Sequence, residues 1–332
     1  MDRHRFYIAQ CLIIIAFAVN IEANAVPIIT EVREFLTDSS IVIEYEVFDA
    51  DDDSLSYRLA FGGEEIDLTR ENVALSDNRI EIPLELVSNK NLPPHILAYD
   101  GEGYGGEYIE VAPAKRARAL VGRFEITNLE FAAFVEVGGY ETERFWIVDD
   151  GSISVPKMGW RYQGKFGWLS PAGWRHFDEP AWASDTVATG AFHPVVGVSW
   201  WECWAFCKWA GVELPTIEQW EAAADKTTGG SDILVVKGNF AGDGDGYESL
   251  APGGSYPSPH FADLAGNVWE WLSNVRDVID YAEFTCAARA LVGGSWQSPS
   301  DAFPDYRRSE CPLLRDPDVG FRVVAAQFPE ED

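Results

Sequence analysis

Large aromatic rings are concentrated in the second half of this chain, where its thirteen tryptophans lie beyond residue 145. The chain also carries 29 glycines, which suit turns better than long regular elements. We therefore expect a loop-rich core that is held by ring packing more than by long helices. With 332 residues, the chain is long enough for two domains.

Acidic side chains outnumber basic ones by 54 to 25, which gives a formal net charge of -29. Phosphate binding needs clustered lysine and arginine, so a nucleic-acid partner is not expected. The acidity favours solubility and tolerance of cations. It does not identify a fold.

The first 25 residues have the pattern of an export signal. Arg3 and Arg5 precede the apolar run CLIIIAFAV, and the segment ANA at 23–25 supplies small residues before a cleavage site at Ala25. The run is too short to span a bilayer comfortably. We predict a mature chain that begins near Val26, is secreted or periplasmic, and has no membrane span.

Residues 26–112 alternate apolar and polar side chains, as strands with one buried face do. Examples are the stretches IVIEYEV, LSYRLAF, RIEIPLEL and GEYIEVA. We predict an N-terminal β-sandwich of the Ig or fibronectin type here. Asp49–Ser54 is interpreted as a solvated hairpin turn, and calcium binding by its acids is the alternative. Residues 113–120 are expected to form a linker.

Three helix starts in the second domain, expected over residues 121–328, share one signature. A serine or threonine is followed three positions later by glutamate or glutamine, so each side chain can accept from the other residue's backbone amide. The pairs are Thr127 with Glu130, Ser199 with Glu202, and Thr216 with Gln219. They predict helices over 128–137, over 200–210 and after residue 216, with irregular structure elsewhere.

Four cysteines remain beyond the export signal: Cys203, Cys207, Cys286 and Cys311. An even number permits two disulfides in an oxidising compartment. Cys203 and Cys207 lie four positions apart on an expected helix, where Cβ atoms are about 6 Å apart and a bridge needs roughly 4 Å. We therefore expect any disulfide elsewhere, first between Cys286 and Cys311. Metal binding by the helical pair is not expected.

Four blocks in order along the second domain carry a family resemblance. They are HPVVGVSWWECWAFCKWAGVELPTIEQWEAAA (193–224), LAGNVWEWLSN (264–274), LVGGSW (291–296) and VGFRVV (319–324). From about residue 118 to the C-terminus the chain closely resembles the sulfatase-modifying-factor family, which includes the formylglycine-generating enzyme. The resemblance implies a loop-rich, C-type-lectin-like fold. The predicted class is therefore α+β, with the β-sandwich followed by this formylglycine-generating-enzyme-like domain.

The resemblance also implies structural calcium, as one or two ions. The first set of matching positions comprises Asp263 and Glu270 by carboxylate, and Gly266 and Val268 by backbone carbonyl. The second set comprises Asn239 and Asp245 by side chain, and Phe240 and Tyr247 by carbonyl. Mixed carboxylate and carbonyl oxygens are the ligands that a hard cation prefers. The alternative for Glu270, which lies between two tryptophans, is a solvated residue flanked by core rings.

The copper chemistry of the family has no matching ligands in this chain. The family enzyme oxidises a substrate cysteine to formylglycine with copper(I) held by two cysteine thiolates, the soft ligands that suit this ion. The matching positions here are Ser298 and Phe303, and neither side chain offers a thiolate. Copper is therefore not expected, and neither is formylglycine generation by the family mechanism.

Other positions match the groove that holds the substrate in the family. Ser295, Ser298 and Trp269 would line it, and Tyr306 and Arg307 are the expected ligand contacts. An aromatic ring can stack on a flat group or a sugar face, and an arginine can bind a carboxylate, sulfate or phosphate. The alternative is that the arginine pairs with one of the many nearby acids. The sequence holds no phosphate loop, no His-Glu-x-x-His zinc motif and no nucleophile elbow.

Three classes of function remain open from the sequence. The first is an exported, calcium-stabilised binding or accessory module whose ligand is a peptide, a protein or a glycan. The second is an atypical enzyme of the family that tailors a peptide or protein oxidatively without the thiolate pair. The third, a displayed recognition protein of variable sequence, is ranked last because the segment after GGSW is not rich in asparagine.

Overall fold

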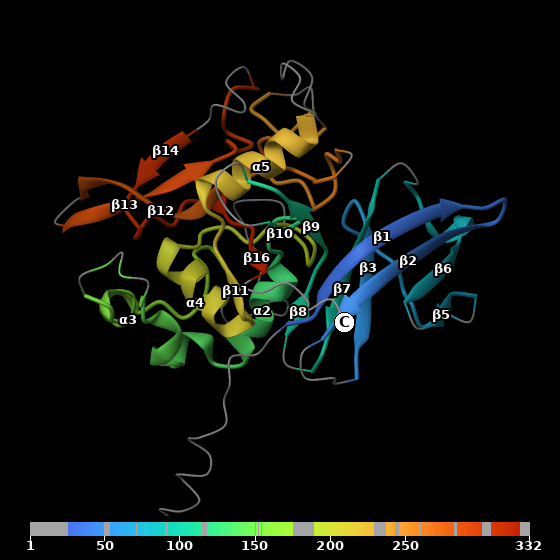
Figure 1. Cartoon of the computed structure of the whole chain (residues 1–332), viewed down its shortest axis with the longest axis horizontal. Coiled ribbons are helices and arrows are strands. Elements are labelled where there is room, and N and C mark those ends of the chain that lie inside the picture. The colour runs from blue at the N-terminus through green and yellow to red at the C-terminus, as the bar shows by residue number, and fades with distance from the viewer. Residues whose placement is uncertain are drawn as a thin grey trace, which may run out of the picture.

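The computed structural model describes residues 26–49, 54–70, 72–76, 78–89, 92–101, 103–113, 118–149, 151, 153, 155–174, 189–228, 237–242, 246–258, 260–281, 284–300 and 307–325. The expected export signal and positions 50–53 of the hairpin turn lie outside these residues. Over the described part, the protein is a mixed α+β molecule with several small antiparallel sheets (Figure 1). None of its described helices is long and apolar enough to cross a membrane.

Two four-stranded sheets follow the N-terminus (Figure 1). The first has the order β1-β2-β6-β5 and is formed by β1 (Ile28–Leu36), β2 (Ser40–Phe48), β6 (Arg79–Pro83) and β5 (Ala74–Ser76). The second has the order β4-β3-β7-β8 and is formed by β4 (Glu64–Glu65), β3 (Ser56–Phe61), β7 (Pro94–Tyr99) and β8 (Tyr104–Gly105). A short 3-10 helix, η1 (Leu84–Leu86), follows β6.

Both N-terminal sheets contribute side chains to one apolar core. Ile41 and Ile43 of β2 and Ile80 of β6 are fully buried in it, together with Leu59 of β3 and Ile96 of β7. Along β2, Ser40 to Ile43 are all buried, and the alternation of the sequence is seen only further on, where buried Tyr45 lies between exposed Glu44 and Glu46. The expectation of half-buried strands in this region is confirmed.

The stretch GEYIEVA, which was expected within the N-terminal sandwich, contributes a strand to another sheet. β9 (Tyr108–Val111) pairs with β10 (Ala119–Gly122), and the order of this sheet is β11-β16-β10-β9, with β11 (Val212–Glu213) and β16 (Val324–Ala325). The predicted boundary at residue 112 therefore divides a β-hairpin. Residues 119 and 120 of the expected linker are part of β10, and positions 114–117 lie outside the described residues.

The fourth sheet contains the long hairpin of the second domain. Its order is β14-β13-β12-β15, with β14 (Arg307–Glu310), β13 (Phe284–Val292), β12 (Trp269–Tyr281) and β15 (Val319–Gly320). The pairing of β12 with β15 is parallel, so the block LAGNVWEW leads directly into a strand beside the block VGFRVV. Two motifs that are about 50 positions apart in the sequence are thus neighbours in space.

The three capping boxes begin helices as predicted. The observed elements are α2 (Asn128–Glu136), α4 (Trp200–Ala210) and α5 (Ile217–Thr228). In each, the Ser or Thr side chain accepts from the backbone amide three positions on, and the Glu or Gln side chain accepts from the cap amide. α2 is followed by Gly138 in the left-handed region, at φ 79°, a conformation in which helices commonly end and which glycine adopts without strain.

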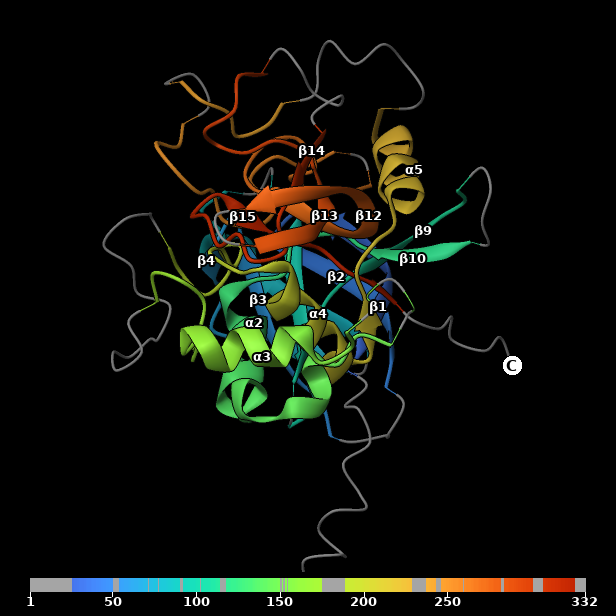
Figure 2. The ribbon, with the colours of Figure 1, turned by 90° about the vertical axis from the view of Figure 1, so that its left-hand side faces the viewer.

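Among the described helices, α3 (Met158–Phe166) was not predicted, and it has no side-chain cap hydrogen bond at Lys157. Two short 3-10 helices, η2 (Gly139–Glu141) and η3 (Glu143–Trp146), precede it. Figure 2 shows α3 in front of α2 and α4, with the β12–β13 hairpin above these helices. α3 packs closely, because a Cβ atom at Gly159 would lie 2.5 Å from the ring of Trp201.

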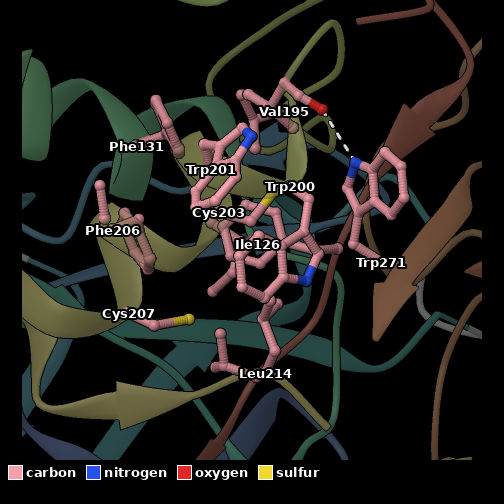
Figure 3. Close-up of a cluster of buried hydrophobic side chains, with 14 of the residues drawn as sticks. Ile126, Phe131, Val195, Trp200, Trp201, Cys203, Phe206, Cys207, Leu214 and Trp271 are labelled. Carbon is pink, nitrogen blue, oxygen red and sulfur yellow. Dashed lines mark hydrogen bonds between the residues drawn. The ribbon is translucent and has the colours of Figure 1, made fainter. Parts of the chain in front are cut away.

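Aromatic rings fill the centre of the second domain, as the tryptophan content predicts. Trp200 and Trp201 of α4 are buried there with Phe131 of α2 and Phe206 of α4, whose rings stack 5.4 Å apart (Figure 3). Trp271 of β12 joins this cluster, and its indole nitrogen donates to the Val198 carbonyl at 3.0 Å (Figure 3). The core is therefore fixed by directed indole hydrogen bonds as well as by apolar contact.

A disulfide joins Cys286 of β13 to Cys311, with Cα atoms 5.9 Å apart. Cys203 and Cys207 are buried free thiols on α4. Both expectations about the cysteines are confirmed. The bridge closes a loop of 25 positions that includes the GGSW segment and β14.

Replacing Cys286 and Cys311 together with serine is expected to lower the free energy of unfolding by about 3 kcal/mol, the usual effect of releasing a loop of this length. Chemical denaturation without reductant measures the change. Added reductant should shift the wild-type midpoint toward that of the double variant and leave the variant where it is. Equal midpoints for the two proteins without reductant would contradict the assignment.

Candidate functional site

The GGSW segment holds two serine hydroxyls beside a carboxylate. The Ser295 hydroxyl donates to Asp318 Oδ2 at 2.7 Å, and its backbone amide donates to Ser298 Oγ at 3.0 Å. All three residues are buried. The backbone carbonyl of Ser298 accepts from the Ala241 amide at 2.9 Å, which ties this segment to the loop at 237–242. The position that matches a copper thiolate thus carries a hydrogen-bonded hydroxyl.

Trp269 and an arginine stack next to these hydroxyls. The Trp269 amide donates to the Asp318 carbonyl at 2.8 Å, and the Arg308 guanidinium lies 4.8 Å from the centre of the Trp269 ring. Nε and Nη2 of Arg308 are buried without a hydrogen-bond partner, and the Glu310 carboxylate is 3.9 Å from Nε. The structure therefore brings Ser295, Ser298 and Trp269 together through Asp318 and places Arg308 against the Trp269 ring.

Of the two ligand contacts expected from the sequence, the structure describes Arg307, which does not join this group. Arg307 donates from Nη2 to Glu221 Oε1 at 2.8 Å and is partly exposed. Arg307 therefore follows the alternative interpretation, in which it pairs with a nearby acid instead of binding a ligand. Tyr306 and Phe303 lie outside the described residues.

The second calcium set is centred on a buried amide. The side chain of Asn239 has no exposed surface, and its Nδ2 donates to the Ser249 carbonyl at 2.7 Å and to Asn267 Oδ1 at 3.0 Å. Its Oδ1 is buried without a hydrogen-bond partner. An oxygen of this kind is costly unless something electropositive satisfies it. The other members of the set follow Asn239 in the chain. Phe240 comes directly after it and Tyr247 lies further on, whereas Asp245 lies outside the described residues.

The carboxylates of the first calcium set already have protein donors. Asp263 accepts from the Gly254 amide at 2.6 Å and from the Tyr256 amide at 2.9 Å. Glu270 is 1% exposed and accepts from Trp220 Nε1 at 2.9 Å, so the interpretation of Glu270 as a solvated residue is wrong. Gly266 and Val268 are also buried. No described group of three His, Cys, Asp or Glu side chains is arranged to hold a metal ion.

Arg322 is the main partner of Glu270. Its Nε lies 2.8 and 3.0 Å from the two Glu270 oxygens, and its Nη2 lies 2.7 Å from Oε1. The remaining donors reach the carbonyls of Gly122, Arg123 and Ala262. Burial opposes the charge of Arg322, but the contact with Glu270 outweighs it and raises the pKa of the guanidinium. Because both Glu270 oxygens are occupied, the first set fits calcium poorly as it is arranged.

A third buried carboxylate, Glu125, lies near this ion pair. Asn267 Nδ2 donates to Glu125 Oε2 at 2.7 Å, whereas Oε1 is buried without a partner. Burial raises the pKa of Glu125 well above its usual value, and the carboxylates of Asp263 and Glu270 raise it further. Three buried carboxylates thus share one guanidinium, Arg322. The region carries a local excess of acid that favours protons or a cation.

Glu125 also lines a small cavity of about 10 Å³, which has room for about one water molecule. The cavity lies between β7 and α2, and His95, Glu107 and Glu130 contribute to its wall. Burial raises the pKa of Glu130 to about 7, and burial lowers the pKa of His95 to about 3. The His95 ring stacks on Phe124 at 3.9 Å, so this polar cavity lies where the N-terminal sheets meet the second domain.

Several members of this site were missed from the sequence. Arg322 was used only as part of the VGFRVV block, although a single cation in an apolar run indicates a buried partner. Glu125 in GRFEIT carries the same signal for a buried acid. Asn267 and Asp318 gave no signal beyond their place next to matched motifs, because their role depends on contacts with distant segments.

Known proteins are similar to this chain over the second domain. A family model described as a sulfatase-modifying factor enzyme 1-like domain matches residues 98–327, more than half of the chain. The formylglycine-generating enzyme of Streptomyces coelicolor is 32% identical over 264 residues, which cover 68% of this chain and 83% of that protein. The inactive C-alpha-formylglycine-generating enzyme 2 of Mus musculus is 30% identical over 263 residues, which cover 70% and 82%.

The similarity extends to proteins with other names. A hercynine oxygenase of Mycolicibacterium thermoresistibile is 28% identical over 234 residues, covering 61% of this chain and 50% of that protein, so this chain spans about half of that relative's length. The solved structure of the Major Tropism Determinant P3c variant has a TM-score of 0.37 at 13% identity, over 92% of this chain and 85% of that chain. A likeness at that level does not identify a fold.

Replacing Glu270 with glutamine is expected to lower the free energy of unfolding by about 3 to 5 kcal/mol, because Arg322 would remain as a buried charge without its counter-ion. Thermal and chemical denaturation measure the loss. The double variant Glu270→Met with Arg322→Met should recover part of it, since no charge is then left buried. The matching single variants are Glu270→Met and Arg322→Met. If the double variant loses more unfolding free energy than these two single variants lose together, the ion pair is not the reason.

Replacing Glu130 with glutamine is expected to change how stability depends on pH. The folded pKa of about 7 lies above the ordinary 4.5, so the wild type loses stability as pH rises between these values, by about 3 kcal/mol. Glutamine can still accept from the Thr127 amide, as the capping box requires, and it lacks this titration. Denaturation midpoints from pH 4 to pH 8 compare the slopes, with the exposed Glu136→Gln as control. Parallel pH profiles for Glu130→Gln and the wild type would contradict the assignment.

Proposed function

Because the chain belongs to the sulfatase-modifying factor family, we propose that it is an exported, calcium-stabilised binding or accessory module without copper-dependent formylglycine-generating activity. Its expected ligand is a peptide, a protein or a glycan. The pattern of the first 25 residues supports export to the periplasm or the exterior. We also propose that the two N-terminal sheets form an Ig- or fibronectin-type sandwich and that the second domain has the C-type-lectin-like fold.

The side chain of Ser298 is the observation that carries this proposal. At the position that matches a copper thiolate, its Oγ accepts from the Ser295 amide at 3.0 Å and is buried. A hydroxyl is a hard ligand and copper(I) prefers sulfur, so this residue does not fit the ion. The second matching position is Phe303, whose side chain has no ligand atom. The two free thiols, at Cys203 and Cys207, are buried in the aromatic core instead.

Calcium is proposed first at the second set. Asn239 Oδ1 is buried without a partner, and the carbonyls of Phe240 and Tyr247 with the Asp245 side chain would complete an all-oxygen set that suits a hard cation. A bound ion would satisfy Asn239 and hold the loop at 239–247 against the core. Calcium at the first set remains a prediction. It is placed second because the Glu270 oxygens there already accept from protein donors.

An atypical family enzyme is the second candidate. The similarity to a protein named hercynine oxygenase favours it, since that name describes an oxidative enzyme outside formylglycine generation. The hydroxyls of Ser295 and Ser298 beside Asp318 could orient a polar group of a substrate. Against it, the relative named an inactive formylglycine-generating enzyme supports a retained fold without the activity.

Incubation of the mature protein with a cysteine peptide bearing a sulfatase-type motif, oxygen and copper(I) is expected to yield no aldehyde. The reason is that neither Ser298 nor Phe303 can supply a thiolate. Mass spectrometry of the peptide measures the product, with the Streptomyces coelicolor relative as the positive control. An aldehyde formed by this chain would contradict the proposal and favour the enzyme.

Excess chelator is expected to lower the melting temperature of the second domain. Calcium at about 100 times its dissociation constant should stabilise the folded state by about 2.7 kcal/mol. Native mass spectrometry counts the ions, one for the second set alone and two if the first set also binds. Asn239→Ala should abolish the chelator effect, whereas Asn128→Ala, another buried asparagine, should retain it. A wild-type melting curve that chelator leaves unchanged would remove calcium from the proposal.

A further inference from the structure

A chain of three buried polar side chains leads away from the unpartnered oxygen of Asn239. Asn239 Nδ2 donates to Asn267 Oδ1 at 3.0 Å, and Asn267 Nδ2 donates to Glu125 Oε2 at 2.7 Å. Asn239 and Asn267 have no exposed surface, and Glu125 is 2% exposed. Asn239 and Asn267 are 28 positions apart in the sequence, and Glu125 is more than a hundred positions from either. Two amides thus connect a carboxylate to the oxygen of the second calcium set.

The backbone fixes the middle member of this chain. Asn267 has a φ of 59°, in the left-handed region, and its amide donates to the Asn239 carbonyl at 2.8 Å. A Cβ atom at Gly266 would lie 2.0 Å from that carbonyl oxygen, so the two backbones touch and this position requires glycine. The Asn267 side chain also bonds both the amide and the carbonyl of Ala251. Asn267 therefore has one orientation.

The orientation of Asn267 determines that of Asn239. Both hydrogens of the Asn239 amide are used, one toward Asn267 Oδ1 and one toward the Ser249 carbonyl. A flipped amide would place its oxygen against these two acceptors, so the flip is disfavoured. Asn239 Oδ1 is thereby held on the side where it meets no protein donor. A ligand oxygen that is already oriented need not lose freedom when a cation binds.

Polarisation is transmitted along the same chain. An acceptor carboxylate at one end polarises each amide in turn, and hydrogen bonds linked in this way strengthen one another. The Glu125 carboxylate should therefore make Asn239 Oδ1 a better cation ligand without touching the ion. Outer residues of this kind typically change metal affinity by about 10- to 100-fold when they are mutated.

We propose that Asn267 and Glu125 are positioning residues for a cation at Asn239, with Asn267 orienting the ligand oxygen and Glu125 polarising it. This inference rests on the calcium proposed above for the second set. It adds two residues that are not ligands themselves. It also gives Glu125, the buried carboxylate near Arg322 that has no ion-pair partner among the described residues, a role in cation affinity.

Calcium titration by isothermal calorimetry tests the proposal on the mature chain, with the calcium ion alone as the probe. Glu125→Gln is expected to weaken calcium binding by about tenfold. Asn267→Gly, which keeps the left-handed backbone, should weaken it at least as much. The matched control is Glu107→Gln, because Glu107 is equally buried and lines the same cavity, but it bonds Arg123 and the Ile96 amide instead of this chain. It should leave the affinity unchanged.

Melting temperatures in excess chelator show separately whether each variant folds. A merely structural role would lower these temperatures and leave the affinity of the folded protein unchanged, which would overturn the proposal. Equal losses of affinity in Glu107→Gln and Glu125→Gln would also overturn it, since any buried charge would then have the same effect. If the wild type binds no calcium, the calcium assignment fails first and this inference fails with it.

Discussion

The buried ion pair between Glu270 and Arg322 is the contact on which the second domain depends. Arg322 has no exposed surface, and it joins β12 to three backbone carbonyls from two other segments. A guanidinium satisfies this many acceptors only when all of them are held in place. The pair therefore fixes where the block LAGNVWEW meets the block VGFRVV, and it does so through directed bonds instead of apolar contact.

Other parts of the site are arranged around that contact. The strand that carries Glu270 also carries Trp269, which supports Arg308, and Trp271, which joins the aromatic core. The turn before the strand holds Asn267 and, through it, Asn239. The chemistry of the site and the packing of the core thus share one short segment. A change in that segment would affect both, so loss of function there needs a separate measurement of folding.

The features that could be predicted from the sequence are local. A capping box places both of its side chains within one turn, so Thr127, Ser199 and Thr216 each begin a helix as expected. α3 was missed because it has no such cap, although it is as long as α2. The partner of Glu270 is 52 positions away, and no spacing rule identifies it. The family resemblance predicted positions for calcium but could not show that a neighbouring arginine occupies one of the carboxylates.

The hairpin of β9 and β10 has a practical consequence for dividing this protein. β10 lies between β16 and β9 in its sheet, and Tyr108–Val111 belongs to the second domain although the sequence pattern joins it to the first. A truncated chain that begins after residue 112 would therefore remove one strand and leave the backbone amides and carbonyls of β10 unpaired on that side. Exposed edges of this kind attract strands from other molecules. Aggregation of such a fragment would then reflect where the chain was cut, and would say nothing about whether the second domain can fold alone.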